Sequence, residues 1–362
     1  MFEQEGTLAN LAVSIARHFG VTNLPNPSLP LADRLLEGFD GSVVLLLLDG
    51  LGKYNLEAAL APDGFFRSHV AGDFASVFPP TTVAATTAAH SGLFPAQSGW
   101  LGWTMYYPQV DNNVTVFLNT DDGGAPAADY FVAGRYAPYT AIADLINRAG
   151  GRARNLSAHE KEPVESLDAM ADIIASGSAE GPRYYDCYWH EPDATMHLHG
   201  ATGEKTIRQI RALESTIAKW PERFHNTLLL ITADHGLIDI DGAVLEDYPD
   251  IADCLARLPS IEPRAVNLFA KPGRADELKR LFDEHFGDAF RLYSHSEVFE
   301  KRLFGPGPNI PWLDAAVGDF VAVSTGRLCF FNTRGQKDVM KGMHAGGTDE
   351  EKNLSLIAVR CE

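Results

Sequence analysis

Aspartate and histidine residues recur in short motifs along the chain. The segment EPDATMH contains Asp193 and His197, and the segment TADHG contains Asp234 and His235. A spacing of four places Asp193 and His197 on one face of a helix, one turn apart. Carboxylate oxygens and imidazole nitrogens together form a ligand set that suits zinc or manganese better than calcium or magnesium. These motifs therefore indicate a site for divalent ions.

Two further residues extend this ligand set to three aspartates and three histidines. Asp49 follows the apolar run 43–48, and His344 lies in GMHAGG, where flanking glycines allow a tight loop. A single Asp after a strand is more often a turn former or a helix cap than a ligand. As a set, three carboxylates and one alkoxide would balance two divalent ions. The resulting near-neutral site can accept an anionic phosphate.

Thr82 is the candidate nucleophile. It lies in the segment SVFPPTTVAATTAAHSGLFP, where Pro79 and Pro80 fix an extended approach and a helix begins at about Thr82. A hydroxyl at that position faces the positive end of the helix, which stabilises an alkoxide, and metal coordination lowers its pKa further. The alternative is that Thr81 or Thr82 serves only as the helix N-cap. This segment alone leaves both interpretations open.

The elements that must position these residues follow an alternating pattern. Apolar strands at 42–48 and 227–233 each end in a polar turn, and the carboxyl edge of a parallel sheet is where ligands bind. The alternation predicts an α/β sandwich with a mostly parallel sheet. Further helices are expected at 53–61, 82–91, 139–149, 163–176 and 203–219, and further strands at 73–77, 152–156, 184–191 and 354–359.

The character of the chain changes between Leu237 and about Gly335. Prolines and glycines become dense, as in GPGPNIP at 305–311, and strand and helix signals are mixed. We interpret residues 237–335 as an inserted α+β cap domain. The catalytic core is then formed by residues 1–236 and 336–362.

Composition and charge restrict the class of partner. The chain has 362 residues, of which 45% are hydrophobic, and this is an ordinary globular composition. A net charge of −18 repels nucleic-acid backbones and anionic membranes, and no apolar run is long enough to span a bilayer. We therefore expect a small-molecule phosphate ester as substrate, with no nucleic-acid polymer and no membrane as partner.

Two further features predict a cytoplasmic location. Glu3 and Glu5 stand where a secretory signal would carry positive charge, and no continuous apolar segment follows them. The four cysteines lie far apart and form no CxxC pair, which argues against a disulfide scaffold and against a thiolate metal site.

These motifs resemble the type I phosphodiesterase/nucleotide pyrophosphatase family of the alkaline phosphatase superfamily. The resemblance runs from about residue 42 to the C-terminus, with the motifs in the family's order. It implies an alkaline-phosphatase-like three-layer sandwich and a phosphothreonine intermediate formed on Thr82. It also implies two metal sites, one formed by Asp49, Thr82, Asp234 and His235, the other by Asp193, His197 and His344.

The chain departs from the family at positions that contact substrate. Nucleotide-cleaving members place an aromatic residue directly after the reactive threonine, where this chain has Val83, and a phosphate-contacting Asn 21 residues after it, where this chain has Trp103. Trp100 and Trp103 can line a substrate pocket by stacking or cation–π contact. The alternative is that these tryptophans pack under the cap.

Three functions remain open from the sequence. The leading hypothesis is a phosphodiesterase or nucleotide-pyrophosphatase-like hydrolase that holds two divalent ions, zinc first and manganese second. The matched motifs contain no arginine, which favours a singly charged diester or pyrophosphate over a monoester dianion. The alternatives are a phosphonoacetate-hydrolase-like or phosphomonoesterase activity, and a non-catalytic binding protein. The intact set of ligands and nucleophile argues against the last.

Overall fold

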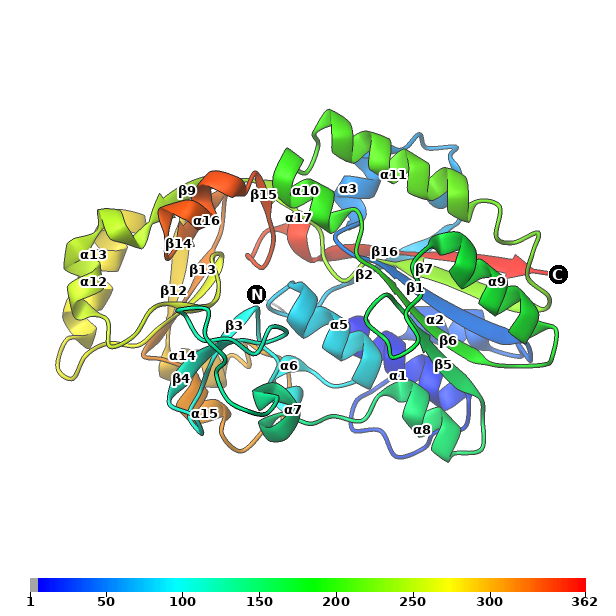
Figure 1. Ribbon diagram of the computed structural model, residues 1–362, viewed down its shortest axis with the longest axis horizontal. Coiled ribbons are helices and arrows are strands. Elements are labelled where there is room, and N and C mark those ends of the chain that lie inside the picture. The colour runs from blue at the N-terminus through cyan, green and yellow to red at the C-terminus, as the bar shows by residue number, and fades with distance from the viewer. Residues whose placement is uncertain (1–5) are drawn as a thin grey trace.

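A six-stranded sheet forms the centre of the larger part of the molecule. The computed structural model describes residues 6–362 (Figure 1), so Glu3 and Glu5 lie outside the described residues. The strand order is β2-β16-β7-β1-β6-β5. Strand β1 pairs in parallel with both neighbours, and only β16 runs antiparallel to the strands beside it. The expected mostly parallel sheet is therefore confirmed. The strands are β1 (Ser42–Leu48), β2 (Val70–Ala75), β5 (Ala153–Leu156), β6 (Tyr184–Trp189), β7 (Thr227–Thr232) and β16 (Asn353–Cys361).

Helices cover both faces of this sheet and complete three layers (Figure 1). Every residue of β1 is buried, as expected for a parallel strand that is covered on both sides. One face carries α3 (Lys53–Ala59), α9 (Leu167–Ser178), α10 (Asp193–His199) and α11 (Glu204–Ile217). The other face carries α1 (Leu8–His18), α2 (Pro30–Leu36), α5 (Thr82–Ser91) and α8 (Ile142–Arg148).

A second sheet of six strands forms the smaller part of the molecule. Its order is β12-β13-β11-β10-β3-β4, and all of its strand pairs are antiparallel. Strands β3 and β4 precede residue 237 in the sequence, so this sheet extends beyond the segment 237–335. The strands are β3 (Thr104–Tyr107), β4 (Asn112–Thr115), β10 (Ser260–Glu262), β11 (Ala265–Leu268), β12 (Phe290–Ser294) and β13 (Phe320–Ser324).

Two short strand pairs connect the two parts. Strand β8 (Ile238–Asp239) pairs with β15 (Gly342–Met343), and β9 (Asp241–Val244) pairs with β14 (Leu328–Phe331). The chain thus leaves and re-enters the core at neighbouring points. The remaining helices are α4 (Phe65–Ser68), α6 (Pro95–Ser98), α7 (Val132–Tyr136), η1 (Leu245–Asp247), α12 (Pro249–Cys254), α13 (Ala275–Phe286), α14 (His295–Glu300), α15 (Leu313–Ala316), α16 (Arg334–Val339) and α17 (Asp349–Lys352). Among residues 6–362, no helix combines the length and apolarity needed to cross a membrane.

Candidate active site

The three aspartates meet at the carboxyl edge of the central sheet. Asp49 follows β1, Asp193 begins α10 shortly after β6, and Asp234 lies two residues beyond β7. The backbone N–H of Gly50 donates to Asp234 Oδ1 at 3.0 Å. Gly50 has φ +78°, and a Cβ on it would lie 3.0 Å from Asp193 Cβ. Only glycine tolerates this conformation and this close approach, so the turn after β1 helps to bring the carboxylates together.

One group of donor atoms surrounds Thr82. His235 Nε2 lies 3.3 Å from Asp49 Oδ1 and 3.4 Å from Asp234 Oδ2. Thr82 Oγ1 lies 3.1 Å from the same nitrogen and 3.5 Å from both Asp49 oxygens. An ion with bonds of about 2.1 Å in a tetrahedron needs its donor atoms about 3.4 Å apart. Asp49 and His235, together with Asp193, have ligand atoms within 4.8 Å of one another and could hold one ion, and Thr82 and Asp234 lie beside them.

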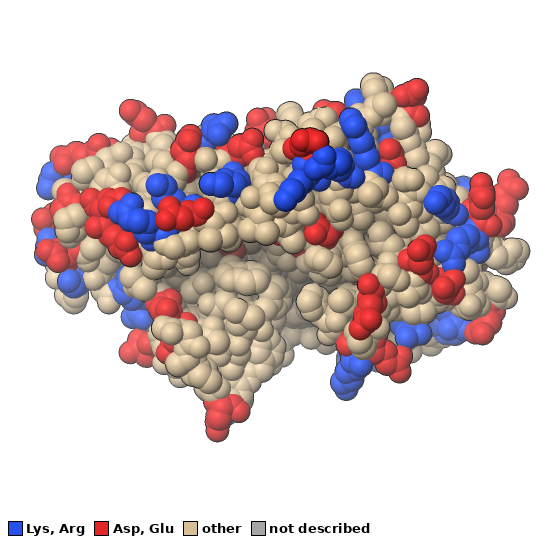
Figure 2. Space-filling view, turned by 45° about the horizontal axis from the view of Figure 1, so that its top comes forward, with Lys and Arg blue, Asp and Glu red and all other residues tan. Residues whose placement is uncertain are grey.

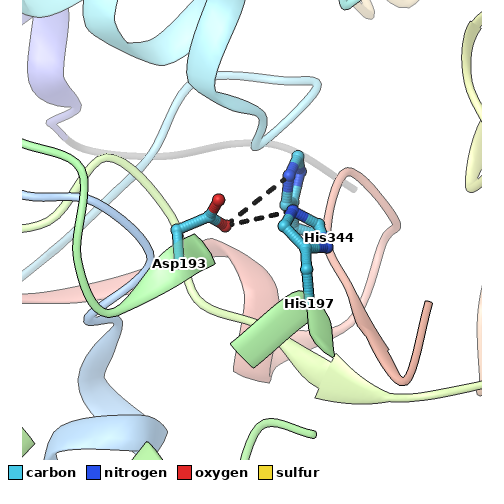
Figure 3. A group of neighbouring side chains, drawn as sticks. All are labelled: Asp193, His197 and His344. Carbon is cyan, nitrogen blue, oxygen red and sulfur yellow. Dashed lines mark ion pairs between the residues drawn. The ribbon is translucent and has the colours of Figure 1, made fainter. Parts of the chain in front are cut away.

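A second group is formed by Asp193, His197 and His344, which converge in Figure 3. Asp193 Oδ1 lies 3.3 Å from His197 Nε2 and 3.9 Å from His344 Nε2. His197 Nδ1 lies 2.8 Å from the carbonyl oxygen of Gly342, and this contact aims Nε2 at the carboxylate. Three protein ligands leave a coordination position open, as catalytic metal sites do.

The aspartate and histidine side chains at this edge of the sheet are buried, and some of their atoms lack hydrogen bonds, as expected for ligands of divalent ions. Burial, with Asp234 and Asp193 nearby, raises the pKa of Asp49 well above its usual value. Burial lowers the pKa of His344 well below its usual value, which favours the neutral imidazole that metals bind. Asp234 Oδ2 and His235 Nδ1 are buried without a hydrogen-bond partner. Clustered carboxylates of this kind are costly unless a cation compensates them, so the donor set fits the implied metals.

The loop that carries His344 is tied to the second sheet by a buried ion pair. Ala345 adopts φ +84°, an uncommon conformation for a residue with a side chain. Glu351 Oε1 accepts from the N–H of Gly346 at 2.7 Å and from Arg264 Nε at 2.6 Å. The side chains of Arg264 and Glu351 are both fully buried. No motif in the sequence marks this pair, because its partners are far apart in the chain.

Thr82 is the first residue of α5, and Thr81 is the N-cap. The Thr81 side chain makes no capping bond and instead donates to Glu262 Oε1 at 2.6 Å. The Thr81 hydroxyl therefore contacts the second sheet, whereas the Thr82 hydroxyl lies among the metal-site donors. Gly92, with φ +70°, ends the helix in the left-handed conformation.

A cavity of about 350 Å³ opens beside Thr82. Its lining includes Thr82, Trp103, Asp193, His197, Glu262 and His344. Trp103 is 43% exposed, whereas Trp100 and Val83 are buried in a hydrophobic cluster and are not among the lining residues. The structure thus separates the residues proposed for substrate contact: Trp103 lines the cavity, and Trp100 and Val83 pack in the hydrophobic cluster. Figure 2 shows a hollowed face on which much of the hollow carries neither Lys nor Arg.

Two polar residues at the site have no motif in the sequence. Tyr188, in β6, donates its hydroxyl hydrogen to Asp49 Oδ2. Glu262, in β10, lines the cavity and is 6% exposed. Burial raises the pKa of Glu262 to about 7, although its hydrogen bonds oppose the shift. The only sequence signal for Tyr188 is its place in the strand that leads into EPDATMH.

Comparisons with known proteins agree with this fold. Murine ectonucleotide pyrophosphatase/phosphodiesterase 5 superposes with a TM-score of 0.65 at 20% identity, covering 88% of this chain and 87% of that one. The human protein of the same name gives 0.66 at 18% identity, covering 88% and 87%. An inactive variant of the murine protein in complex with AMP gives 0.64 at 18% identity, covering 88% of each chain.

A curated human relative matches over a shorter stretch. Ectonucleotide pyrophosphatase/phosphodiesterase family member 7 is 26% identical over 137 residues, which are 36% of this chain and 29% of the relative. The match therefore spans less than a third of that protein's length. The model of the family described as type I phosphodiesterase/nucleotide pyrophosphatase matches residues 43–347. Because this match covers most of the chain, the protein belongs to the type I phosphodiesterase/nucleotide pyrophosphatase family.

Proposed function

We propose that the chain hydrolyses phosphodiester or pyrophosphate bonds in a small molecule, with Thr82 as the nucleophile. The observation that carries this proposal is the position of the Thr82 hydroxyl. Its oxygen lies 3.1 Å from His235 Nε2 and 3.5 Å from the Asp49 carboxylate, within a donor set of metal-site spacing. The N-cap of α5 is Thr81, so capping of the helix does not explain the position of the Thr82 hydroxyl.

Two divalent ions are part of the proposal, with zinc as the first choice and manganese as the alternative. Asp49, Thr82, Asp234 and His235 would hold one ion, and Asp193, His197 and His344 the other. When bound, the ions would supply positive charge to the phosphate oxygens and lower the pKa of a coordinated hydroxyl. The mixed oxygen and nitrogen donors, with open coordination in the second group, support this assignment.

The residues of the chain contribute nucleophilicity and charge stabilisation. Thr82 Oγ1 attacks phosphorus in line with the leaving group; a P–O bond to threonine forms as the P–O bond to the leaving group breaks. Water then cleaves the phosphothreonine ester and restores the hydroxyl. The N-terminus of α5 places its positive end beside this oxygen, which favours the negative charge that develops there.

The lining of the cavity supports a singly charged substrate. Among the described residues, the lining contains no lysine and no arginine, so a second phosphate charge would depend on the ions alone. The complex of the murine relative with AMP supports a nucleotide as one candidate, and the exposed ring of Trp103 offers a surface for a base. Phosphonoacetate-hydrolase-like and phosphomonoesterase activities remain the second candidates.

The test compares three substrates in the presence of zinc or manganese. We expect the protein to hydrolyse bis-p-nitrophenyl phosphate faster than p-nitrophenyl phosphate or phosphonoacetate. Thr82→Ala should abolish turnover and leave most of the bound metal in place, whereas Thr325→Ala, outside this cavity, should change neither. Predominant monoester turnover would contradict the diesterase assignment, and full activity of Thr82→Ala would exclude Thr82 as nucleophile.

A further inference from the structure

Another cavity, of about 330 Å³, lies between α6, the end of α14, the loop 301–312 and α15. It shares no lining residue with the catalytic cavity. Its size lies within the range of small-molecule sites, which is about 300–1,000 Å³. Most of its lining is apolar and includes Ala96, Val298, Phe299, Leu303, Phe304 and Leu313.

The polar groups of this cavity are mainly hydrogen-bond donors. Among the described residues that line it, Arg302 is the only charged one, and its guanidinium has no ion pair or hydrogen bond. The backbone N–H groups of Gly307 and Asn309 also have no partner among residues 6–362. By contrast, the carbonyl oxygens of Val298 and Phe304 already accept backbone hydrogen bonds. Unpaired donors that include one cation favour a bound anion.

The backbone at Arg302 has a conformation that glycine usually adopts. Arg302 has φ +49° and directly follows Lys301, the C-cap of α14. Its N–H donates to the carbonyl of Phe299, and the N–H of Leu303 donates to that of Val298, which together form a Schellman motif. Glycine is the commonest residue at this position because it has no Cβ. An arginine here carries a conformational cost, so its side chain requires a separate explanation.

From these observations we infer that the cavity binds a small carboxylate monoanion with an apolar body, such as an aryl carboxylate. The Arg302 guanidinium donates paired N–H groups to the carboxylate oxygens, and the apolar body lies against the lining. A single cation balances a single negative charge, so a carboxylate fits better than the dianion of a phosphate monoester. Because the two cavities have different residues, this site is independent of the proposed function.

The test uses 4-fluorobenzoate as the probe and 4-fluorobenzamide as its uncharged counterpart of similar shape. Fluorine NMR titration of the intact chain gives a dissociation constant for each. For wild-type protein we expect about 1 mM for fluorobenzoate, and binding of fluorobenzamide that is roughly tenfold weaker. The titration is done with and without zinc, because a carboxylate could also bind metal ions. The ratio of the two constants should be the same in both conditions.

Arg302→Gly removes the guanidinium and supplies the residue that the Schellman motif favours, so the variant should fold. We expect the ratio of the two dissociation constants to fall to about one, while the midpoint of urea unfolding stays at or above the wild-type value. Lys301→Gln is the matched control. Lys301 is the neighbouring cation, pairs with Glu297 at 3.8 Å and does not line the cavity, so this variant should keep the wild-type ratio.

Three results would overturn the inference. One is that wild-type protein binds neither probe, and another is that it binds both equally. The third is a ratio that persists in Arg302→Gly, because the carboxylate would then bind elsewhere. If that variant also unfolds at a lower urea concentration, Arg302 serves only as a cation at the negative end of α14. None of these measurements depends on turnover, so failure of the proposed function would leave them valid.

Discussion

Loss of the Glu351 charge should destabilise the protein strongly, because it leaves Arg264 buried and unpaired. Arg264 donates from Nε to Glu351 Oε1 at 2.6 Å and from Nη2 to Oε2 at 2.9 Å, and both side chains are fully buried. Breaking one side of a buried pair costs about 3–5 kcal/mol. Since domains of this kind are stable by only about 5–15 kcal/mol, Glu351→Gln should remove a large share of the unfolding free energy.

The same substitution should weaken metal binding, because Glu351 also orders the loop after His344. Its Oε1 accepts from the N–H of Gly346, two residues beyond the histidine. A residue that orients a ligand is typically worth about 10–100-fold in metal affinity. Urea unfolding of the metal-free protein measures the first effect, and zinc titration against a competing chelator measures the second.

An exposed ion pair provides the control for this prediction. Arg280 and Glu284 form a pair in α13 whose side chains are both 56% exposed. Solvent screens such pairs, so Glu284→Gln should cost at most about 0.5 kcal/mol. Arg264→Met leaves the carboxylate unpaired instead and should destabilise as strongly as Glu351→Gln. If Glu351→Gln proves as mild as Glu284→Gln, the buried pair does not hold the two parts together as argued.

Three further predictions concern the sheet edge and the nucleophile helix. Tyr188→Phe removes the hydroxyl that donates to Asp49, so the affinity for one zinc ion should fall about tenfold in a calorimetric titration; unchanged affinity would refute the orienting role. Gly50→Ala forces a side chain into φ +78° against Asp193, and urea unfolding should show a loss of about 1–3 kcal/mol. Burial lowers the pKa of His90, but the carboxylate of Asp186 outweighs it and the pKa is raised overall. The protonated His90 side chain therefore stabilises the fold fully below about pH 6.5, and this effect is lost as the pH rises through the raised pKa. The difference in free energy of unfolding between wild type and His90→Asn should shrink over that range. A constant difference would contradict this.

Local patterns predicted the elements of the core well. The expected strand 42–48 and helix 82–91 have the observed bounds, because an apolar run and a Pro-Pro break mark their ends in the sequence itself. The helix expected at 163–176 begins later, at Leu167, because the Ser166 side chain caps it by accepting from the N–H of Ala169. Pairing between distant segments was harder to predict from the sequence. Nothing in residues 104–115 indicates that they join the second sheet through Thr104 and Ile261.

The residues of the candidate site differ in the same way: some can be found from sequence motifs, and others only from their contacts in the fold. Metal ligands can be found from sequence because coordination demands particular residue types at short spacings, as for Asp193 and His197. The place of Glu262 at the site follows from contacts between distant segments, because its carboxylate accepts from the N–H of Trp103, 159 residues away in the chain. Sequence motifs therefore mark the candidate ligands, whereas contacts of this kind become visible only in the fold.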